Sequence, residues 1–424
     1  MHIAMVAGEY PPLWGGLGSA AYNLCKFLTE MGHEISLITR KMNKKTVRPK
    51  IKNVEIFEVK WLYAPMFFTR SYGKNALKEI VKINSEKNID VIHLHCPLIS
   101  LNEKEIIHLK KNIAPVLTSL HGSWLGERDG ILAAQKHNES AVWRNPNDLA
   151  ILLTAKYFSK FERAAARASD ICVANSVSTK NDFIERYLLG KTWDCEVIHW
   201  GVDEKLFSPL DHDSLDDQTR FKKIRRRYNA ADNNALSGKY TTNTPLLLAV
   251  GRLAARKGFR FLLKSMPTVL RKFPQAKLVI IGRGKMHKIL NKQAKKLGIS
   301  DSVTIESGMD FRDLADCYKS ADLVIYPSFY EGQGLIPLEA MASGTPVVTV
   351  NDGPLPEMVD KTVGSLYNVG DYNHLGLKIL EELDNPENRK LKAKNGRKRI
   401  LTMGTFTHKK TAESFNRLYE KILN

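Results

Sequence analysis

Short apolar runs alternate with helical stretches along almost the whole chain, and this alternation constrains the fold more than any other feature of the sequence. It begins with HIAMVAG at 2–8, a glycine-containing loop, a helical stretch that ends near Gly32, and ISLIT at 35–39. Strands separated by helices predict a mainly parallel sheet with helices on both faces. Further runs of this kind in the first half of the chain are VEIFEV (54–59), DVIHLH (90–95), APVLTSLHG (114–122), DICVAN (170–175) and CEVIHWG (195–201).

The alternation stops near residue 203 and starts again at residue 244. The intervening segment, 204–243, is polar and rich in Asp, Asn, Arg and Lys. The later apolar runs are TPLLLAVGR (244–252), AKLVIIG (276–282), SVTIES (302–307), ADLVIYPS (321–328) and TPVVTV (345–350). We therefore expect an α/β protein with two Rossmann-like, doubly wound parallel-sheet domains, 1–203 and 244–400, that face a central ligand cleft. A polar linker at 204–243 would join them, and a C-terminal helix at 401–424 would pack back on the first domain.

Length and composition favour a multidomain globular protein. The chain has 424 residues, of which 43% are hydrophobic, and no apolar run approaches the roughly 20 residues of a membrane span. The short apolar N-terminus lacks the basic start of a signal peptide. Five scattered cysteines without a CxxC pair argue against both a disulfide framework and a zinc ribbon. We expect a cytoplasmic protein.

The positive charge is concentrated in two places. The formal net charge is +19, and residues 251–300 hold 14 basic and no acidic side chains. A shorter run, Arg40 to Lys52, holds seven basic residues without an acid. Such runs are often solvated surface, but they also suit nucleic acid or an anionic membrane. The larger block has few aromatic residues on which bases could stack, so we expect no nucleic acid partner. Peripheral contact of the shorter run with the inner face of a membrane stays open.

A glycine loop precedes the first predicted helix. Gly16, Gly18 and Ala21 satisfy the dinucleotide pattern GxGxx(G/A). The loop is long for that pattern, and the strand at 35–39 ends in Arg40 instead of an acidic residue. Because Arg40 could meet a 2′-phosphate, an NADP-dependent oxidoreductase is an alternative. A long glycine loop before a helix also binds phosphate more generally, through free backbone amides.

The segment 322–357 carries the most specific chemistry. Glu331 and Glu339 are separated by seven residues that include a glycine-rich loop. A strand end, free loop amides and a carboxylate that can bind two neighbouring hydroxyls suit a nucleotide with a ribose and a pyrophosphate. The carboxylates could instead complement a helix dipole. Arg252 and Lys257 follow another strand, where cations could stabilise a departing pyrophosphate.

Histidines and a DxD pattern offer weaker signals. His121 stands at the carboxyl end of a predicted strand, where α/β folds bind ligands. His93 and His95 share a face of one strand and could bind metal, although core packing is the simpler interpretation. Asp211 and Asp213 form the DxD pattern in the polar linker, where we expect them to be solvated.

Further motifs accompany the glutamate pair in a fixed order. They are PS before it, LEAMASGTPVV after it, VGRLAARKG at 250–258, VANS at 173–176 and VIHWGVDEKLFSP at 197–209. With these motifs the whole chain resembles the retaining family 4 glycosyltransferases, the glycosyl transferases group 1 with an E-x7-E motif and the GT-B fold. Two positions depart from that family's pattern: Gln333 replaces a usual aromatic residue, and Arg283 replaces a common acidic one. Both bear on the preference for base and sugar.

The resemblance implies a hexosyltransferase that retains anomeric configuration by front-face attack and needs neither metal nor cofactor. Its partners would be a nucleotide-sugar donor, UDP-glucose-like first and GDP-mannose second, and a glycan, lipid-linked or small-molecule acceptor that enters from the N-terminal domain. The implied catalytic residues are His121, Arg252, Lys257 and Glu331. The implied donor-binding residues are Gly15, Gly16, Arg283, Met309, Gly334, Leu335, Ile336 and Glu339.

Overall fold

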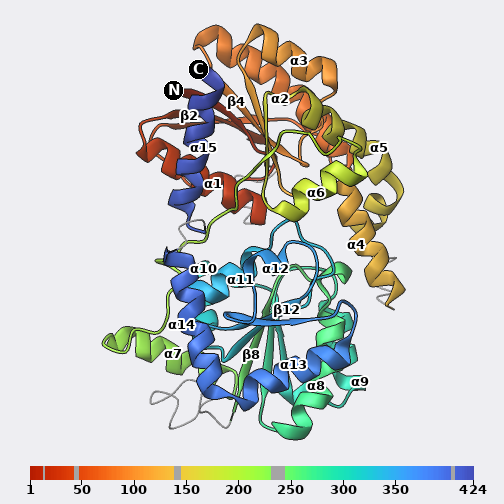
Figure 1. The fold of residues 1–424 in the computed structure, drawn as a ribbon, viewed down its shortest axis with the longest axis vertical. Helices are drawn as coiled ribbons and strands as arrows, with labels where there is room; N and C mark the ends of the chain where they lie inside the picture. The colour runs from red at the N-terminus through yellow and green to blue at the C-terminus, as the bar shows by residue number, and fades with distance from the viewer. Residues whose placement is uncertain (13–14, 43–46, 138–144, 231–243, 403–405) are drawn as a thin grey trace. The chain divides into compact units, whose positions relative to one another are not determined.

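The structure is a computed structural model that describes residues 1–12, 15–42, 47–137, 145–230, 244–402 and 406–424. It divides into two compact units. Unit 1 comprises Met1–Arg128, Pro146–Gly201 and His408–Asn424, and unit 2 comprises Asp129–Asn145 and Val202–Thr407. Each unit has its own parallel sheet flanked by helices (Figure 1), which confirms the predicted α/β class with two parallel-sheet domains.

Unit 1 contains a seven-stranded sheet in the order β3-β2-β1-β4-β5-β6-β7. The chain builds outward from β1 in one direction and then from β4 in the other. Connections leave the carboxyl ends of β1 and β4 in opposite directions, and such a switch point opens a ligand crevice. The strands are β1 (His2–Val6), β2 (Glu34–Arg40), β3 (Val54–Val59), β4 (Val91–Cys96), β5 (Val116–Leu120), β6 (Ile171–Ala174) and β7 (Glu196–Val197). The helices are α1 (Gly16–Glu30), α2 (Phe67–Glu86), α3 (Glu103–Asn112), α5 (Pro146–Ala168), α6 (Val177–Arg186) and α15 (His408–Leu423), while α4 (Trp124–Lys136) starts in unit 1 and ends in unit 2.

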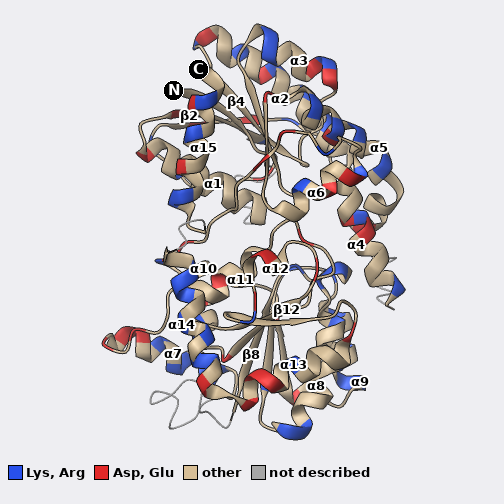
Figure 2. Cartoon of the chain, in the orientation of Figure 1, with Lys and Arg blue, Asp and Glu red and all other residues tan. Residues whose placement is uncertain are grey.

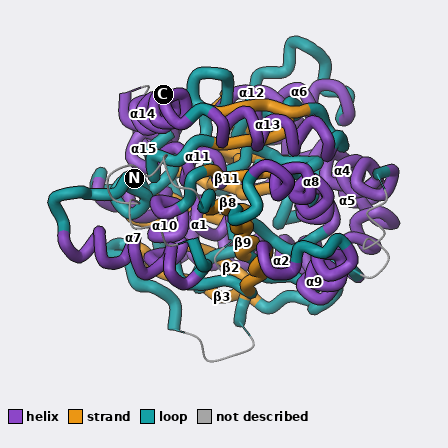
Figure 3. Tube along the Cα trace, turned by 90° about the horizontal axis from the view of Figure 1, so that it is seen from below, coloured by secondary structure: helices purple, strands orange, loops and turns teal. Residues whose placement is uncertain are grey.

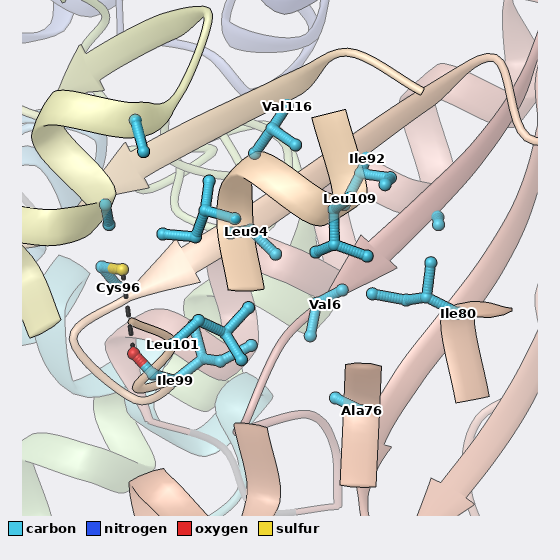
Figure 4. Close-up of a cluster of buried hydrophobic side chains, with 14 of the residues drawn as sticks. Val6, Ala76, Ile80, Ile92, Leu94, Cys96, Ile99, Leu101, Leu109 and Val116 are labelled. Atoms are coloured by element: carbon cyan, nitrogen blue, oxygen red, sulfur yellow. Dashed lines mark hydrogen bonds between the residues drawn. The ribbon is translucent and has the colours of Figure 1, made fainter. Parts of the chain in front are cut away.

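One face of the unit 1 sheet is covered by α2 and α3. Figure 4 shows the resulting cluster of apolar side chains. Ile92 on β4 and Val116 on β5 are fully buried, as are Ile80 on α2 and Leu109 on α3. Each Å² of apolar surface that this packing removes from water stabilises the folded unit by about 25 cal/mol.

Unit 2 contains a six-stranded sheet in the order β10-β9-β8-β11-β12-β13, with a switch point between β8 and β11. In Figure 3 these central strands run close together among the helices. The strands are β8 (Leu246–Val250), β9 (Lys277–Ile281), β10 (Val303–Glu306), β11 (Leu323–Tyr326), β12 (Val347–Val350) and β13 (Gly364–Tyr367). The helices are α7 (Leu215–Arg227), α8 (Phe259–Lys272), α9 (His287–Lys296), α10 (Phe311–Ser320), α11 (Leu335–Ala342), α12 (Leu355–Met358), α13 (Tyr372–Asp384) and α14 (Pro386–Thr402), with short 3₁₀ turns η2 (Ala255–Lys257) and η3 (Ser300–Ser302).

The polar segment 204–243 contributes a packed element to unit 2. Helix α7 packs against α10 and buries Phe221 and Ile224. Arg225 on the same helix is 1% exposed and donates to the Ser320 and Thr244 carbonyls and to the Asp322 carboxylate, at 2.9–3.0 Å. Part of the segment predicted as a polar linker is therefore integral to the fold of unit 2, and residues 231–243 lie outside the described residues.

The C-terminal helix α15 belongs to unit 1, where it packs on α1. Its apolar stripe predicts this, because Phe415 and Tyr419 lie one helical turn apart and both are fully buried. Phe415 stacks on Trp200 with ring centroids 5.3 Å apart. The start of the predicted C-terminal segment, residues 401–402, instead ends α14 in unit 2.

The basic block of residues 251–300 is mostly helix surface. Figure 2 shows Lys and Arg spread over α8 and α9. Of the 14 basic side chains in this block, only those of Arg256 and Lys257 are buried. These two residues therefore need a separate explanation.

Candidate functional site

Two loops meet at the switch point of the unit 2 sheet. One follows β8 and contains η2, and the other follows β11. The Phe329 amide donates to the Arg256 carbonyl at 2.7 Å. Between the loops, Gly258 has φ +70°, and a Cβ there would lie 1.9 Å from the Pro327 carbonyl oxygen. Glycine is required at this position, and the close approach brings the two loops onto one edge of the sheet.

A buried ion pair lies where these loops meet. The Lys257 ammonium donates to Oε1 of Glu331, and the Tyr326 hydroxyl donates to the same oxygen. Lys257 Nζ is also 3.3 Å from the Tyr326 hydroxyl oxygen. The Lys257 and Glu331 side chains are 10% and 12% exposed. Their mutual contacts fix both charged groups in position before any ligand binds.

Burial and neighbouring charges set the protonation of this pair. Burial lowers the pKa of Lys257 to about 8, with further lowering from Arg256 and Arg252 and an opposing contribution from Glu331. Burial alone would raise the pKa of Glu331, but Lys257 and Arg256 hold it below its usual value. The site therefore keeps a lysine cation next to an ionised carboxylate at neutral pH.

Glu339 lies on α11, whose first turn follows the glycine loop. Gly334 precedes the helix with φ +95°, a conformation that favours glycine. The Tyr318 hydroxyl donates to Oε2 of Glu339 at 2.6 Å. Burial raises the pKa of Glu339 to about 7, although the Tyr318 bond opposes the rise. No described side chain caps the amides that begin α11, at Gly334, Leu335 and Ile336, so this helix end can bind an anion.

Other predicted site residues lie at the same carboxyl edge of the unit 2 sheet. Arg252 follows β8 and Arg283 follows β9, and both are exposed. The Leu253 amide donates to the Arg283 carbonyl at 2.8 Å, which ties these two loops together. The Arg283 side chain lies close to Gly308, which follows β10 and precedes Met309. Gln333 is buried at 3% exposure.

His121 lies in unit 1, directly after β5. Its amide donates to the Cys96 carbonyl at 3.1 Å, and its ring lies parallel to the Trp200 ring, with centroids 4.9 Å apart. Nε2 of His121 is 2.9 Å from Nδ1 of His95 at the end of β4. His121 is therefore held on one face by Trp200 and on one edge by His95.

The glycine loop of unit 1 leads into α1. Gly15 is the N-cap residue, and a Cβ there would lie 1.9 Å from a Glu9 carboxylate oxygen. A Cβ at Gly16 would meet nothing within 4 Å. No acidic residue stands in the first turn of α1, within the described part of the chain. The helix end can bind an anionic group, and the Glu9 carboxylate already lies beside it.

A cavity of about 400 Å³ lies at the carboxyl ends of β1 and β2 in unit 1. The Arg40 guanidinium lies over the Trp61 and Phe68 rings, 5.0 and 4.6 Å from their centroids, and donates to the Gly8 carbonyl. Arg48 donates to the Pro11 and Arg40 carbonyls at 2.8 Å. The described lining residues are Gly8, Glu9, Tyr10, Thr39, Arg40, Lys41, Met42, Arg48, Trp61 and Tyr63. The basic run thus begins with two arginines that organise this cavity, and its residues 43–46 lie outside the described ranges.

The residues with weaker signals have structural partners. His93 is fully buried and lies 2.6 Å from the Tyr419 hydroxyl and 2.7 Å from the Ser119 hydroxyl. Asp211 and Asp213 precede α7 on the surface. In the described ranges, no three His, Cys, Asp or Glu side chains gather in a group that could hold a metal ion.

Sequence reasoning misses three residues that shape the site, Tyr326, Tyr318 and Arg256, and it interprets His95 as a core residue without linking it to His121. Tyr326 could have been found because it ends β11, just before the loop that carries Glu331. His95 could have been found because β4 and β5 pair in register, so His95 and His121 end neighbouring strands. No comparable signal marks Tyr318, which reaches Glu339 from α10.

Two family models match the chain one after the other. The model of glycosyltransferase family 4 matches residues 14–206, and the model of the glycosyl transferases group 1 matches residues 234–399. The chain belongs to the family 4 glycosyltransferases of GT-B type. None of the comparisons supports the oxidoreductase alternative.

This glycosyltransferase has relatives that match nearly its full length. An uncharacterized glycosyltransferase of Methanocaldococcus jannaschii is 28% identical over 375 residues, which are 87% of this chain and 85% of that protein. The MMP α-(1→4)-mannosyltransferase of Mycolicibacterium hassiacum is 23% identical over 100% of this chain and 98% of that protein. Among solved structures, sucrose-phosphate synthase from Thermosynechococcus elongatus superposes with a TM-score of 0.76 at 21% identity, covering 99% of this chain and 98% of that one. That similarity establishes the GT-B fold.

Proposed function

We propose that this glycosyltransferase moves a hexose from a nucleotide sugar to its acceptor with retention of configuration and without a metal ion. Unit 2 holds the donor, and unit 1 supplies His121 and the acceptor side. The observation that carries this proposal is the buried Lys257–Glu331 pair, with Tyr326 on the same carboxylate, at the switch point of the unit 2 sheet.

The charges in unit 2 match a donor that breaks next to a pyrophosphate. As the sugar leaves, negative charge grows on the phosphate, and a fixed cation stabilises that charge without reorganisation. Lys257 is such a cation, and exposed Arg252 adds a second one from the same loop. The amides of Gly334 to Ile336 at the start of α11, together with Gly15 and Gly16 in unit 1, add donors for the phosphates.

The carboxylates of Glu339 and Glu331 bind different parts of the donor. Glu339 accepts hydrogen bonds from the two ribose hydroxyls, and Arg283 and Met309 contact the base. Glu331 accepts a hydrogen bond from the sugar. Its Oε1 already binds Lys257 and Tyr326, so it is a poor nucleophile, which supports front-face attack without a covalent enzyme intermediate.

The donor is UDP-glucose-like as the first candidate and GDP-mannose as the second. The first candidate comes from the family resemblance, and a mannose donor gains support from the mannosyltransferase relative. The acceptor is a glycan, a lipid-linked sugar or a small molecule, and the cavity beside Arg40 is its proposed entry point in unit 1.

A lipid-linked acceptor would bring unit 1 to an anionic membrane. In the described ranges no helix has the length and apolarity needed to cross a bilayer. Support for peripheral contact comes from the basic run together with the apolar residues Leu62 and Tyr63, which are 58% and 82% exposed near the cavity. Replacing Lys41, Lys44, Lys45 and Lys50 by Gln should reduce binding to anionic vesicles at low salt and leave donor affinity unchanged. If the wild-type protein does not bind such vesicles at low salt, the acceptor is a soluble molecule.

Retention and metal independence are tested together by following the reaction with proton NMR. From an α-linked nucleotide sugar, the first product formed should be α-linked, and EDTA should leave the rate unchanged. A β-linked product would contradict retention. Loss of turnover in EDTA that Mg²⁺ or Mn²⁺ restores would contradict the proposed role of Lys257 and Arg252.

A further inference from the structure

Three histidines on neighbouring strands of unit 1 form a continuous chain of imidazoles. His93 and His95 stack with ring centroids 4.3 Å apart, and Nδ1 of His95 is 2.9 Å from Nε2 of His121. His93 and His95 are both fully buried. The proposed function uses only His121, so the role of the two buried rings is open.

The contact of His95 with Met5 determines which ring nitrogen of His95 carries the proton. Nε2 of His95 is 2.9 Å from the Met5 sulfur. A thioether sulfur has no hydrogen and can only accept, so Nε2 must carry the proton for this contact to be attractive. The opposite tautomer would set a nitrogen lone pair against the sulfur lone pairs. His95 in its neutral form therefore has an unprotonated Nδ1.

The proton on His121 then follows from the bond between the two rings. Because Nδ1 of His95 is an acceptor, Nε2 of His121 must donate to it. The remaining nitrogen of neutral His121 is Nδ1, which makes no hydrogen bond to any described residue. Burial lowers the pKa of His95 well below its usual value, as do His93 and His121, and burial lowers the pKa of His121 to about 3. Both rings therefore stay neutral at physiological pH, which keeps the tautomers defined.

We propose that His95 is a positioning residue that fixes His121 in the Nε2-protonated tautomer, so that His121 presents Nδ1 as a hydrogen-bond acceptor to a hydroxyl group of the donor sugar. The inference rests on the proposed function only for the identity of that hydroxyl group. Trp200 completes the arrangement, because its ring is stacked within 9° of the His121 plane and limits rotation of the imidazole. Met5 thus fixes the tautomer of His95, His95 accepts a hydrogen bond from Nε2 of His121, and Trp200 stacks on the His121 ring.

The tautomer can be measured directly by long-range ¹H–¹⁵N NMR of the full-length protein labelled at its histidines. In the wild type, His121 should show an unprotonated Nδ1 and a protonated Nε2. In His95→Leu the acceptor is lost, so the two His121 nitrogens should shift toward a mixture of tautomers. His95→Asn can offer an amide oxygen near the former Nδ1 and should restore much of the wild-type pattern.

His93 provides the matched control. It lies two residues away on the same strand with the same burial, but it bonds to Tyr419 and Ser119 instead of His121. His93→Leu should lose stability and leave the His121 tautomer unchanged. If His95→Leu does not fold, the wild-type spectrum and His95→Asn still decide the matter.

Kinetics separates this role from a structural one. His95→Leu should lower kcat/KM about 3- to 10-fold, the value of one neutral hydrogen bond, with recovery in His95→Asn. A protonated Nδ1 on wild-type His121, or an equal tautomer change in His93→Leu, would overturn the proposal. A failure of the proposed function would look different, because the wild type would transfer no sugar while its His121 tautomer stayed as described.

Discussion

Glu331 and Glu339 stand close together in the sequence, and their charge states differ because their neighbours differ. Glu331 contacts a lysine ammonium and has a lowered pKa, whereas Glu339 accepts a hydrogen bond from a tyrosine hydroxyl and has a pKa that burial raises to about 7. Their spacing along the chain predicts that both belong to one donor site. It does not reveal their charges, because Lys257 comes from a loop 74 residues away and Tyr318 from another helix.

Donor affinity should depend on pH through Glu339. Ribose hydroxyls donate to the carboxylate, so the ligand prefers the deprotonated form, and affinity should rise with pH through about 7. At pH 6 the nucleoside diphosphate should bind about tenfold more weakly than at pH 8. Calorimetry should give this profile for the wild type. Glu339→Gln is the control. It lacks the Glu339 carboxyl, so any pH dependence that remains in this variant belongs to the ligand's own phosphate.

Glu339→Gln should also weaken binding at pH 8, because a neutral amide accepts hydroxyl bonds less strongly than a carboxylate does. The expected loss is about 1.5–3 kcal/mol. The same calorimetric titration measures it, and circular dichroism checks that the variant is folded. An unchanged affinity in the folded variant would remove Glu339 from the site.

Lys257→Ala should lower turnover about 10²- to 10³-fold, since it removes a fixed cation from the departing phosphate. Lys272→Ala is the matched control from the same basic block. Lys272 is 55% exposed and pairs with Asp384 on the surface, so its loss should leave turnover unchanged. Equal rates for both variants would show that Lys257 has only a structural role.

At the scale of elements, the sequence predicts the positions of most strands but not the packing of helix α7. Eleven of the strands coincide with apolar runs such as DVIHLH and DLVIYPS, since buried parallel strands are continuously apolar. One further run, CEVIHWG, yields only the two-residue strand β7, and the short edge strand β13, GSLY, is missed. Helix α7 looks like exposed linker because its sequence is so polar. Its packing depends on Arg225, whose partners Ser320, Asp322 and Thr244 come from two distant segments.

Arg225→Met should therefore destabilise unit 2 strongly. The change leaves the Asp322 carboxylate, 1% exposed, without its cation, and breaking a buried pair in this way costs about 3–5 kcal/mol. Urea unfolding should show a lower midpoint. Arg226→Ala, at the exposed neighbouring position, should change stability by less than about 0.5 kcal/mol. A similar small change for Arg225→Met would mean that α7 is not integral to unit 2.

At the scale of the whole molecule, the sequence predicts two parallel-sheet units because the alternation of strands and helices occurs twice. It cannot predict that α15 adds to the first unit the tyrosine that contacts His93, since that contact joins residues 326 positions apart. We propose that the nucleotide binds unit 2, where the proposed donor contacts follow β8, β9, β10 and β11. The unit 1 cavity beside Arg40 is assigned to the acceptor.

Hydrogen exchange with and without nucleoside diphosphate tests that assignment most directly. A thermal-shift panel of UDP, GDP and ADP first identifies the ligand, since saturation at 100 times Kd adds about 2.7 kcal/mol of stability. With that ligand bound, amides of residues 251–258 and 327–340 should exchange more slowly, while the segment around Trp61 and Tyr63 should be unaffected. Protection confined to the cavity beside Arg40, or no binding by any of the three nucleotides, would contradict the account.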